Sequence, residues 1–129
     1  ATALNLRRAY YACVSYADAQ VGNLMNQLDK LGIRENTIVV LWGDHGYKLG
    51  DYNSWCKWTN MNIDTNVPFI FNTPNGKKGL VSESPVEALD IYPTLAELCG
   101  LEIPLHVDGQ CIVPFFDVPS LMFACFYSP

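Results

Sequence analysis

Three side chains that could act on an anionic ester lie close together in the sequence: Asp44, His45 and Lys57. Asp44 and His45 come one residue after the apolar run Thr37–Trp42 and stand between Gly43 and Gly46. Just past a strand end, in a glycine-flanked turn, a carboxylate and an imidazole can both face one ion. Hard cations such as calcium or magnesium prefer oxygen donors, whereas an imidazole alone favours zinc. Two ligands do not close a metal site, so the remaining ligands must come from elsewhere.

Lys57 follows His45 by twelve residues and lies between Cys56 and Trp58. An ammonium group beside aromatic side chains can serve as a point charge for a phosphate or sulfate oxygen. The residue types alone leave simpler alternatives open. Asp44 and His45 could be a structural capping pair, and Lys57 could be an ordinary surface lysine.

The elements that would position these residues can be predicted from hydrophobic periodicity. Apolar residues at steps of three and four predict an amphipathic helix over Leu6–Leu31. Thr37–Trp42 is apolar on both faces, which is typical of a buried strand in a parallel sheet. We expect Val67–Phe71 to be its neighbour in one central sheet, with the long helix packed on that sheet.

Two further segments complete the pattern. Ile91–Cys99 is predicted to be a helix with Asp90 as its N-cap and Gly100 just past its C-terminus, and it should pack on the same sheet. Tyr47–Asp64 shows no clean period, and a loop of this length is usually functional or disordered. Its aromatic content argues against disorder.

Composition bounds the class of protein. The 129 residues suffice for one domain, and 50% hydrophobic with 16% charged residues excludes a disordered chain. A formal charge of −5 argues against nucleic-acid binding, and no apolar run reaches the length of a membrane span. The five cysteines form no CxxC pair, so most are predicted to be small buried hydrophobic residues.

Several linked motifs carry a resemblance to a known family. The strings LWGDHGYKLGDYNSWCKWTN, VPFIFNTP and ALDIYPTLAELCGL, in this order and spacing, resemble the sulfatase family of the alkaline-phosphatase superfamily. The pattern is closest to its iduronate-2-sulfatase-like branch and covers about residues 8–116. The resemblance implies an α/β fold with a mostly parallel central sheet flanked by helices. Residues 1–129 would form one partial domain, with 117–129 an uncertain tail.

The resemblance also implies a chemistry. Sulfatases hydrolyse sulfate esters with a formylglycine hydrate and a divalent cation, usually calcium. The family's late metal ligands fall on Asp44 and His45, and its sulfate-binding lysine falls on Lys57. The implied substrate is a sulfated carbohydrate such as glycosaminoglycan iduronate-2-sulfate, and the implied location is lysosomal, periplasmic or secreted.

The chain also departs from the family pattern. No cysteine or serine here stands in a Cys/Ser-x-Pro-x-Arg motif, and the early Asp-Asp metal ligands are absent. The sequence therefore resembles a central-to-late segment of a sulfatase, and we expect it to be inactive alone. A phosphonate or phosphate ester hydrolase of the same superfamily, or a non-catalytic module with this fold, remains an alternative. The oligomeric state cannot be deduced from the sequence.

Overall fold

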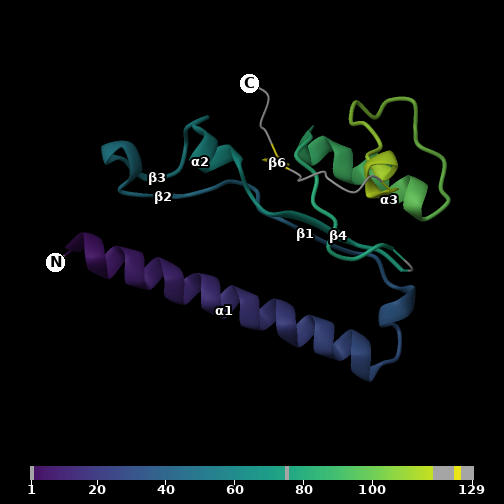
Figure 1. Cartoon of the computed structure of the whole chain (residues 1–129), viewed down its shortest axis with the longest axis horizontal. Helices are drawn as coiled ribbons and strands as arrows, with labels where there is room; N and C mark the ends of the chain where they lie inside the picture. Colours follow the sequence, from purple (N-terminus) through teal and green to yellow (C-terminus); the bar gives the residue numbers. More distant parts are fainter. Residues whose placement is uncertain (1, 75, 118–123, 126–129) are drawn as a thin grey trace.

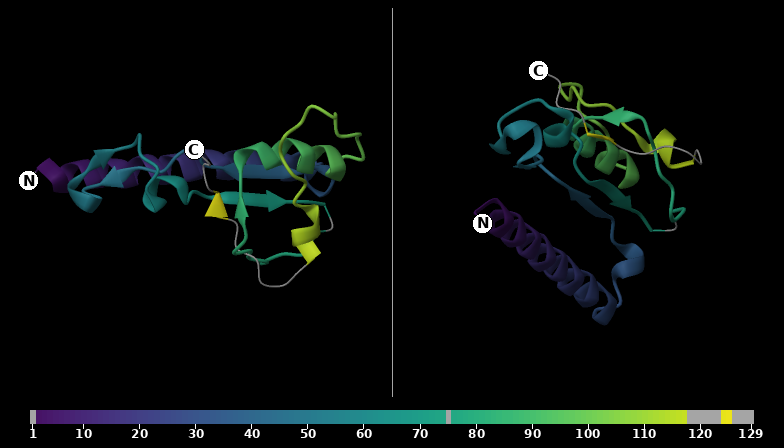
Figure 2. Two further views of the ribbon diagram at one scale, coloured as in Figure 1. Left: turned by 90° about the horizontal axis from the view of Figure 1, so that it is seen from above. Right: turned by 60° about the vertical axis from the view of Figure 1, so that its left-hand side comes forward.

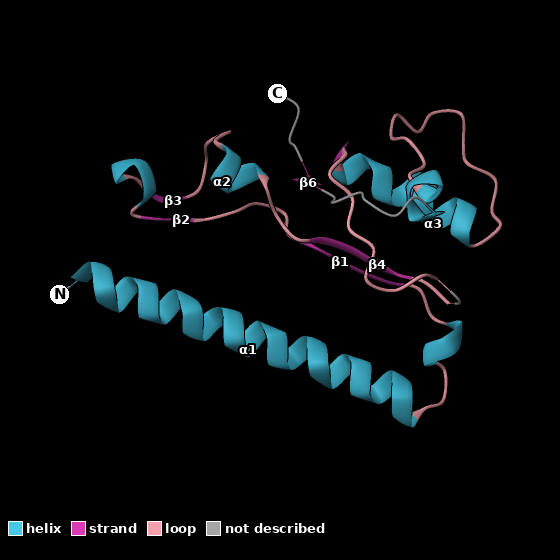
Figure 3. Ribbon diagram, viewed as in Figure 1, coloured by secondary structure: helices cyan, strands magenta, loops and turns pink. Residues whose placement is uncertain are grey.

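The computed structural model describes residues 2–74, 76–117 and 124–125 (Figure 1). Most of the predicted tail, 118–123 and 126–129, lies outside the described residues. In chain order the helices and strands are α1 (Thr2–Lys30), η1 (Arg34–Asn36), β1 (Val39–Trp42), β2 (Lys48–Leu49), η2 (Asp51–Asn53), β3 (Trp55–Cys56), α2 (Asn62–Thr65), β4 (Phe69–Asn72), β5 (Pro85–Val86), η3 (Ala88–Asp90), α3 (Ile91–Leu98), η4 (Val113–Asp117) and β6 (Ala124–Cys125). The strands are two to four residues long, and Figure 3 distinguishes them from the helices and loops by colour.

The two strands predicted to be neighbours, β1 and β4, do pair with one another. Their register matches Val39 with Asn72 and Trp42 with Phe69, and the backbone N–H of Gly43 extends the ladder to Pro68 at 2.9 Å. The pair is antiparallel, whereas the apolar run Thr37–Trp42 suggested a strand from the parallel part of a sheet. Apolarity on both faces indicates burial but carries no information about the direction of the partner strand.

The position of this pair also differs from the prediction. Among the described residues β1 and β4 pair only with each other, so neither is a central strand. Leu41 and Trp42 are exposed, because no described element covers that part of β1.

The hydrophobic core lies between β4 and the C-terminal helices. Phe69 is buried with Val67, Val86 and Ile112, and Phe71 packs against this cluster. Successive side chains of a strand point to opposite faces, so Phe69 and Phe71 share the core face. Residues of α3 and η4 close the core, which confirms that the predicted helix Ile91–Cys99 packs on the sheet.

Asp90, the first residue of the D-x-x-P-T stretch at the start of α3, is not the side-chain N-cap that the sequence predicted. Asp90 has helical backbone angles (φ −73°, ψ −15°) and makes no side-chain cap to α3. Its carboxylate instead accepts the backbone N–H groups of Glu87 at 2.8 Å and Gln110 at 2.7 Å. Thr94 Oγ1 donates to the Asp90 carbonyl and accepts the N–H of Ile112 at 3.1 Å. The motif therefore ties α3 to two loops.

The predicted C-terminus of this helix is confirmed. Gly100 has φ +67°, its N–H bonds the Glu97 carbonyl at 2.9 Å, and the Leu101 N–H bonds the Ala96 carbonyl at 2.8 Å. These two bonds form a Schellman motif, which needs a residue that tolerates positive φ.

The predicted long helix is present as α1, but its packing differs from the prediction. Figures 1 and 2 show α1 on one side of the β1–β4 pair and α3 on the other. No residue of α1 is buried, and Leu24 is 68% exposed. Its strongest contacts run to β2 and η1 instead of β1 and β4. Val21, Met25 and Leu28 form a half-buried stripe, whereas Leu24 and Leu31 are exposed, so periodicity located the helix but did not predict which of its apolar residues are covered.

The prediction that most cysteines are buried is wrong. Cys13, Cys56 and Cys99 are exposed free thiols, and Cys111 is half-buried. Cys13 lies on α1, most of which no other described element covers. No helix among the described residues is long and apolar enough to cross a membrane.

Candidate functional site

The candidate site is built on the turn that follows β1. The backbone N–H of Gly46 bonds the carbonyl of Asp64 at 2.6 Å, which ties the turn to α2. A Cβ on Gly46 would overlap the Ile63 carbonyl and lie 2.8 Å from Asp64 Cα. Only glycine allows the two backbones to approach this closely. The second glycine of the G-D-H-G turn is therefore required by packing.

Asp44 and Lys57 are thirteen positions apart in the chain, and their side chains meet at this turn. Lys57 Nζ lies 3.9 Å from Asp44 Oδ2, and the two side chains are 37% and 77% exposed. An exposed ion pair this long contributes little to stability. Both charges are therefore accessible to a ligand at the end of β1.

The segment that presents Lys57 has unusual backbone conformations. Cys56 and Trp58, on either side of Lys57, have φ of +71° and +79°. Positive φ is uncommon for residues other than glycine, and such residues cluster at functional sites. Lys57 Nζ lies 5.9 Å from the centre of the Trp58 ring, and Trp58 is itself 86% exposed. The lysine thus has an aromatic neighbour at the surface, as the sequence predicted.

His45 lies on the inner side of the turn. Its Nδ1 is 2.8 Å from the Gly46 carbonyl oxygen and 3.9 Å from Asp64 Oδ1. A carbonyl oxygen only accepts hydrogen bonds, so Nδ1 must carry the proton. In the neutral ring the lone pair is then on Nε2. The local structure therefore selects Nε2 as the atom with which His45 would bind a metal.

Sequence reasoning missed a buried polar network beneath His45. Lys48 and Asp64 are both buried, and Lys48 Nζ lies 2.6 Å from Asp64 Oδ2 and 3.0 Å from Thr59 Oγ1. Thr59 Oγ1 also donates to Asp64 Oδ2. The network joins β2, α2 and the segment between β3 and α2. Both Lys48 and Asp64 fall in the stretch predicted to be a loop, where charged residues are normally solvated, so no sequence signal singled them out.

The network changes the acidity of Asp64. Burial by itself would raise the pKa of this carboxyl group. The hydrogen bonds from Lys48 and Thr59, with the positive charge of Lys48 and the coulombic contribution of His45, outweigh burial and hold its pKa below the ordinary value. Asp64 is thus ionised at neutral pH.

The donor set fits a divalent cation in part. Asp44 offers a carboxylate oxygen, the donor that calcium prefers, and His45 offers Nε2. Calcium takes about six to eight ligands. The described residues contain no group of three or more His, Cys, Asp or Glu side chains that could hold a metal ion. Asp44 and His45 could therefore hold one side of a cation, whose remaining ligands must come from other groups.

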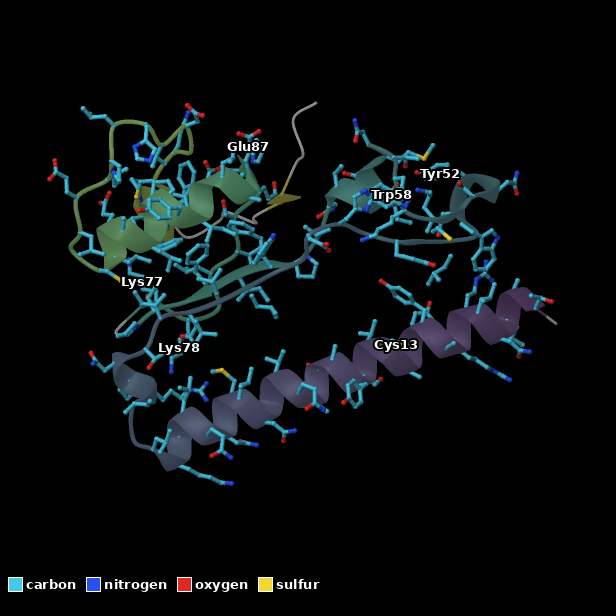
Figure 4. All side chains as sticks on the ribbon, turned by 180° about the vertical axis from the view of Figure 1, so that it is seen from behind. Cys13, Tyr52, Trp58, Lys77, Lys78 and Glu87 are labelled. Carbon is cyan, nitrogen blue, oxygen red and sulfur yellow. The ribbon has the colours of Figure 1, made fainter. Side chains whose placement is uncertain are left out.

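A hollow on the described surface lies away from these residues. It has a volume of about 690 Å³ and is lined by the loop after β4, η1 and η4, including Lys77 and Lys78. Figure 4 shows Lys77 and Lys78 at the opposite end of the molecule from Trp58 and Tyr52. The hollow and the Asp44–Lys57 site are therefore separate features of the described residues.

Comparison with known proteins identifies relatives of this chain. The family model described as sulfatase matches residues 2–101. A sulfatase from Formosa agariphila is 44% identical over 106 residues, covering 82% of this chain and 21% of that protein. Human iduronate 2-sulfatase is 36% identical, covering 88% of this chain and 24% of that protein.

Solved structures agree with these sequence matches. One, a complex with its substrate D-glucosamine-2-N,6-O-disulfate, has a TM-score of 0.73 at 27% identity and covers 84% of this chain and 22% of that chain. The phosphonate monoester hydrolase of Silicibacter pomeroyi has a TM-score of 0.72 at 37% identity, covering 77% of this chain and 20% of that chain. The chain thus spans about a fifth to a quarter of the length of its relatives. The match of the family model over most of the chain shows that this protein belongs to the sulfatase family, with its α/β fold.

Proposed function

We propose that this chain supplies one side of the active site of a sulfatase that hydrolyses sulfate esters of carbohydrates. Asp44 and His45 would bind a calcium ion, and Lys57 would bind the sulfate group. The observation that carries the proposal is the 3.9 Å separation of Lys57 Nζ and Asp44 Oδ2 at the end of β1. An anion held at a cation beside Asp44 would be within reach of the Lys57 ammonium group.

Each residue has a distinct role in this proposal. Asp44 contributes negative charge and an oxygen ligand, and His45 contributes Nε2 because its Nδ1–H is held by the Gly46 carbonyl. Lys57 donates hydrogen bonds to the sulfate oxygens and neutralises the charge that develops as the S–O bond breaks. A bound calcium ion would polarise the sulfate, and the nucleophile of the family, formylglycine, would come from a sequence motif that these 129 residues do not contain.

The names of the relatives support sulfate esters as the substrate class, and the support for a carbohydrate comes from the disulfated glucosamine complex. Iduronate 2-sulfatase, arylsulfatase K and choline-sulfatase are among the similar proteins, and one similar structure holds a disulfated glucosamine. The second candidate is hydrolysis of phosphonate monoesters, because a hydrolase of that class has the same fold at 37% identity. A point charge such as Lys57 suits either tetrahedral anion, so the distinction must be made by experiment.

The test compares two substrates with the full-length gene product. An aryl sulfate and an aryl phosphonate monoester with the same leaving group are assayed with calcium present. We expect the larger kcat/KM for the sulfate ester. A larger value for the phosphonate would establish the second candidate, and no turnover of either by a protein that binds calcium would indicate a non-catalytic module.

A further inference from the structure

We propose that Asp64, anchored by Lys48 and Thr59, is a positioning residue that fixes the imidazole of His45 with Nδ1–H inward and Nε2 toward the cation. This inference rests on the proposed function of His45 as a metal ligand. It assigns a role to the buried Lys48–Asp64 ion pair, neither member of which is a proposed metal ligand or sulfate-binding residue.

The first argument is the unequal use of the two carboxylate oxygens. Oδ2 of Asp64 receives both available donors, Lys48 Nζ at 2.6 Å and Thr59 Oγ1. Oδ1 is buried without a hydrogen-bond partner. Leaving a buried carboxylate oxygen unsatisfied is costly, so such an atom requires an explanation. A further hydrogen-bond donor directed at Oδ1 would explain why this oxygen is buried.

The second argument is that the imidazole of His45 lies beside Oδ1. Nδ1 of His45 lies 3.9 Å from Oδ1, about 1 Å beyond hydrogen-bond distance, and it already carries its proton because the Gly46 carbonyl can only accept. At 3.9 Å the proton on Nδ1 is close enough for electrostatic attraction to the Asp64 carboxylate. Metal-binding histidines commonly donate their other ring N–H to a carboxylate, which fixes the tautomer and the ring orientation.

The third argument is that the residues of this network come from three different segments of the chain. Lys48 lies on β2, Asp64 on α2, and His45 on the turn after β1. The Gly46 N–H bond to the Asp64 carbonyl joins this turn to α2 at the same place. Lys48 compensates the buried negative charge, and Thr59 fixes the carboxylate rotamer. The orientation of Oδ1 is therefore set before any metal binds.

The experiment must separate positioning from a purely structural role. In the double variant Lys48→Met/Asp64→Leu, apolar side chains replace the buried pair, a change that commonly preserves or increases stability. The full-length gene product is labelled with ¹⁵N-histidine and studied without calcium, and calcium binding is measured by titration calorimetry. The Gly46 carbonyl then holds Nδ1–H without the Asp64 carboxylate, so we expect the fraction of His45 in the Nδ1–H tautomer to decrease, and calcium affinity to fall about 10-fold to 100-fold.

Two further variants complete the design. Asp64→Asn keeps the shape of the side chain and is read by the same two measurements, so the test does not depend on folding of the double variant. Asp29→Asn removes the carboxylate of the exposed Arg34–Asp29 pair and should change neither measurement. Unchanged ring-nitrogen signals and unchanged calcium affinity in a folded Asp64 variant would overturn the proposal.

His45→Gln separates this inference from the function on which it rests. If His45→Gln lowers calcium affinity but the Asp64 variants do not, the metal-ligand role stands and the positioning role is overturned. If His45→Gln leaves calcium affinity unchanged, the ligand role fails, and with it the proposal that Asp64 orients a ligand.

Discussion

At the scale of the residue, the feature that the proposed function depends on most is the pair formed by Asp44 and Lys57. Both stand close to the end of β1, and their side chains meet at 3.9 Å although they belong to different loops. His45, adjacent to Asp44 in the chain, instead faces the buried Asp64 with its Nδ1. The ligand roles of Asp44 and His45 and the sulfate-binding role of Lys57 stay predictions until tested by substitution.

The role of Lys57 can be tested by truncating it. In the full-length gene product, Lys57→Ala should lower kcat/KM for an aryl sulfate at least about 100-fold, since an electrostatic contact to the reacting group is commonly worth about 3 kcal/mol. Lys78→Ala, at the other end of the molecule (Figure 4), is the matched control and should leave kcat/KM unchanged. Equal kinetics for both variants would make Lys57 an ordinary surface lysine.

The buried Asp64 predicts a dependence of stability on pH. Its pKa is lower in the folded chain than in the unfolded chain, so its stabilising contribution is present above the unfolded value, about 4, and is lost as pH falls through the lower folded value. Denaturant unfolding of the wild type and of Lys48→Met/Asp64→Leu should therefore give a stability difference that is constant from pH 5 to 7. Below about pH 4 the free energy of unfolding of the wild type should decrease relative to that of the variant. A difference independent of pH down to pH 2 would contradict this.

At the scale of the element, close backbone approach positions the site more than strand pairing does. β2 and β3 are two residues each, and α2 is a single turn. Gly46 connects them to β1 by lying directly against the backbone of Ile63 and Asp64. Gly22 in α1 offers a contrast, because no atom lies within 4 Å of a Cβ built on it.

This contrast gives a paired prediction. Gly46→Ala should destabilise the protein by about 1–3 kcal/mol, because overpacking forces the turn and α2 apart. Gly22→Ala should stabilise it by up to about 1 kcal/mol, since alanine is the better helix former and meets no atom there. Urea unfolding of both variants measures the two changes. A Gly46→Ala protein as stable as the wild type would show that the turn can move freely away from α2.

At the scale of the whole molecule, the described residues form a layered piece of an α/β fold. α3 covers one side of β1–β4 and buries a small core, whereas α1 on the other side exposes most of its apolar residues (Figure 2). The chain spans about a fifth to a quarter of its relatives, and the site it carries is correspondingly one-sided. A cation and a lysine stabilise a transition state but still need a nucleophile to attack sulfur.

The 129-residue chain should therefore show no sulfatase activity by itself. None of its cysteines is followed by Pro at the second position and Arg at the fourth, so none should become formylglycine. Purified chain is assayed with a chromogenic aryl sulfate and calcium, beside an Asp44→Ala control, and light scattering monitors the aggregation that exposed apolar surface favours. Turnover above that of the control would require a nucleophile within these residues.

The sequence by itself determined the local features of this protein. Periodicity located α1, apolar runs located β1 and β4, Gly100 marked the end of α3, and linked motifs indicated the family and the residues Asp44, His45 and Lys57. These features depend on neighbours a few positions apart, which a linear pattern records. Tertiary structure decided the antiparallel direction of β1 and β4, the exposure of α1, the use of Asp90 as a loop anchor, and the Lys48–Asp64 pair beneath His45. Those features depend on which distant segments meet, and a lysine and an aspartate sixteen residues apart carry no sign of being buried together until the chain has folded.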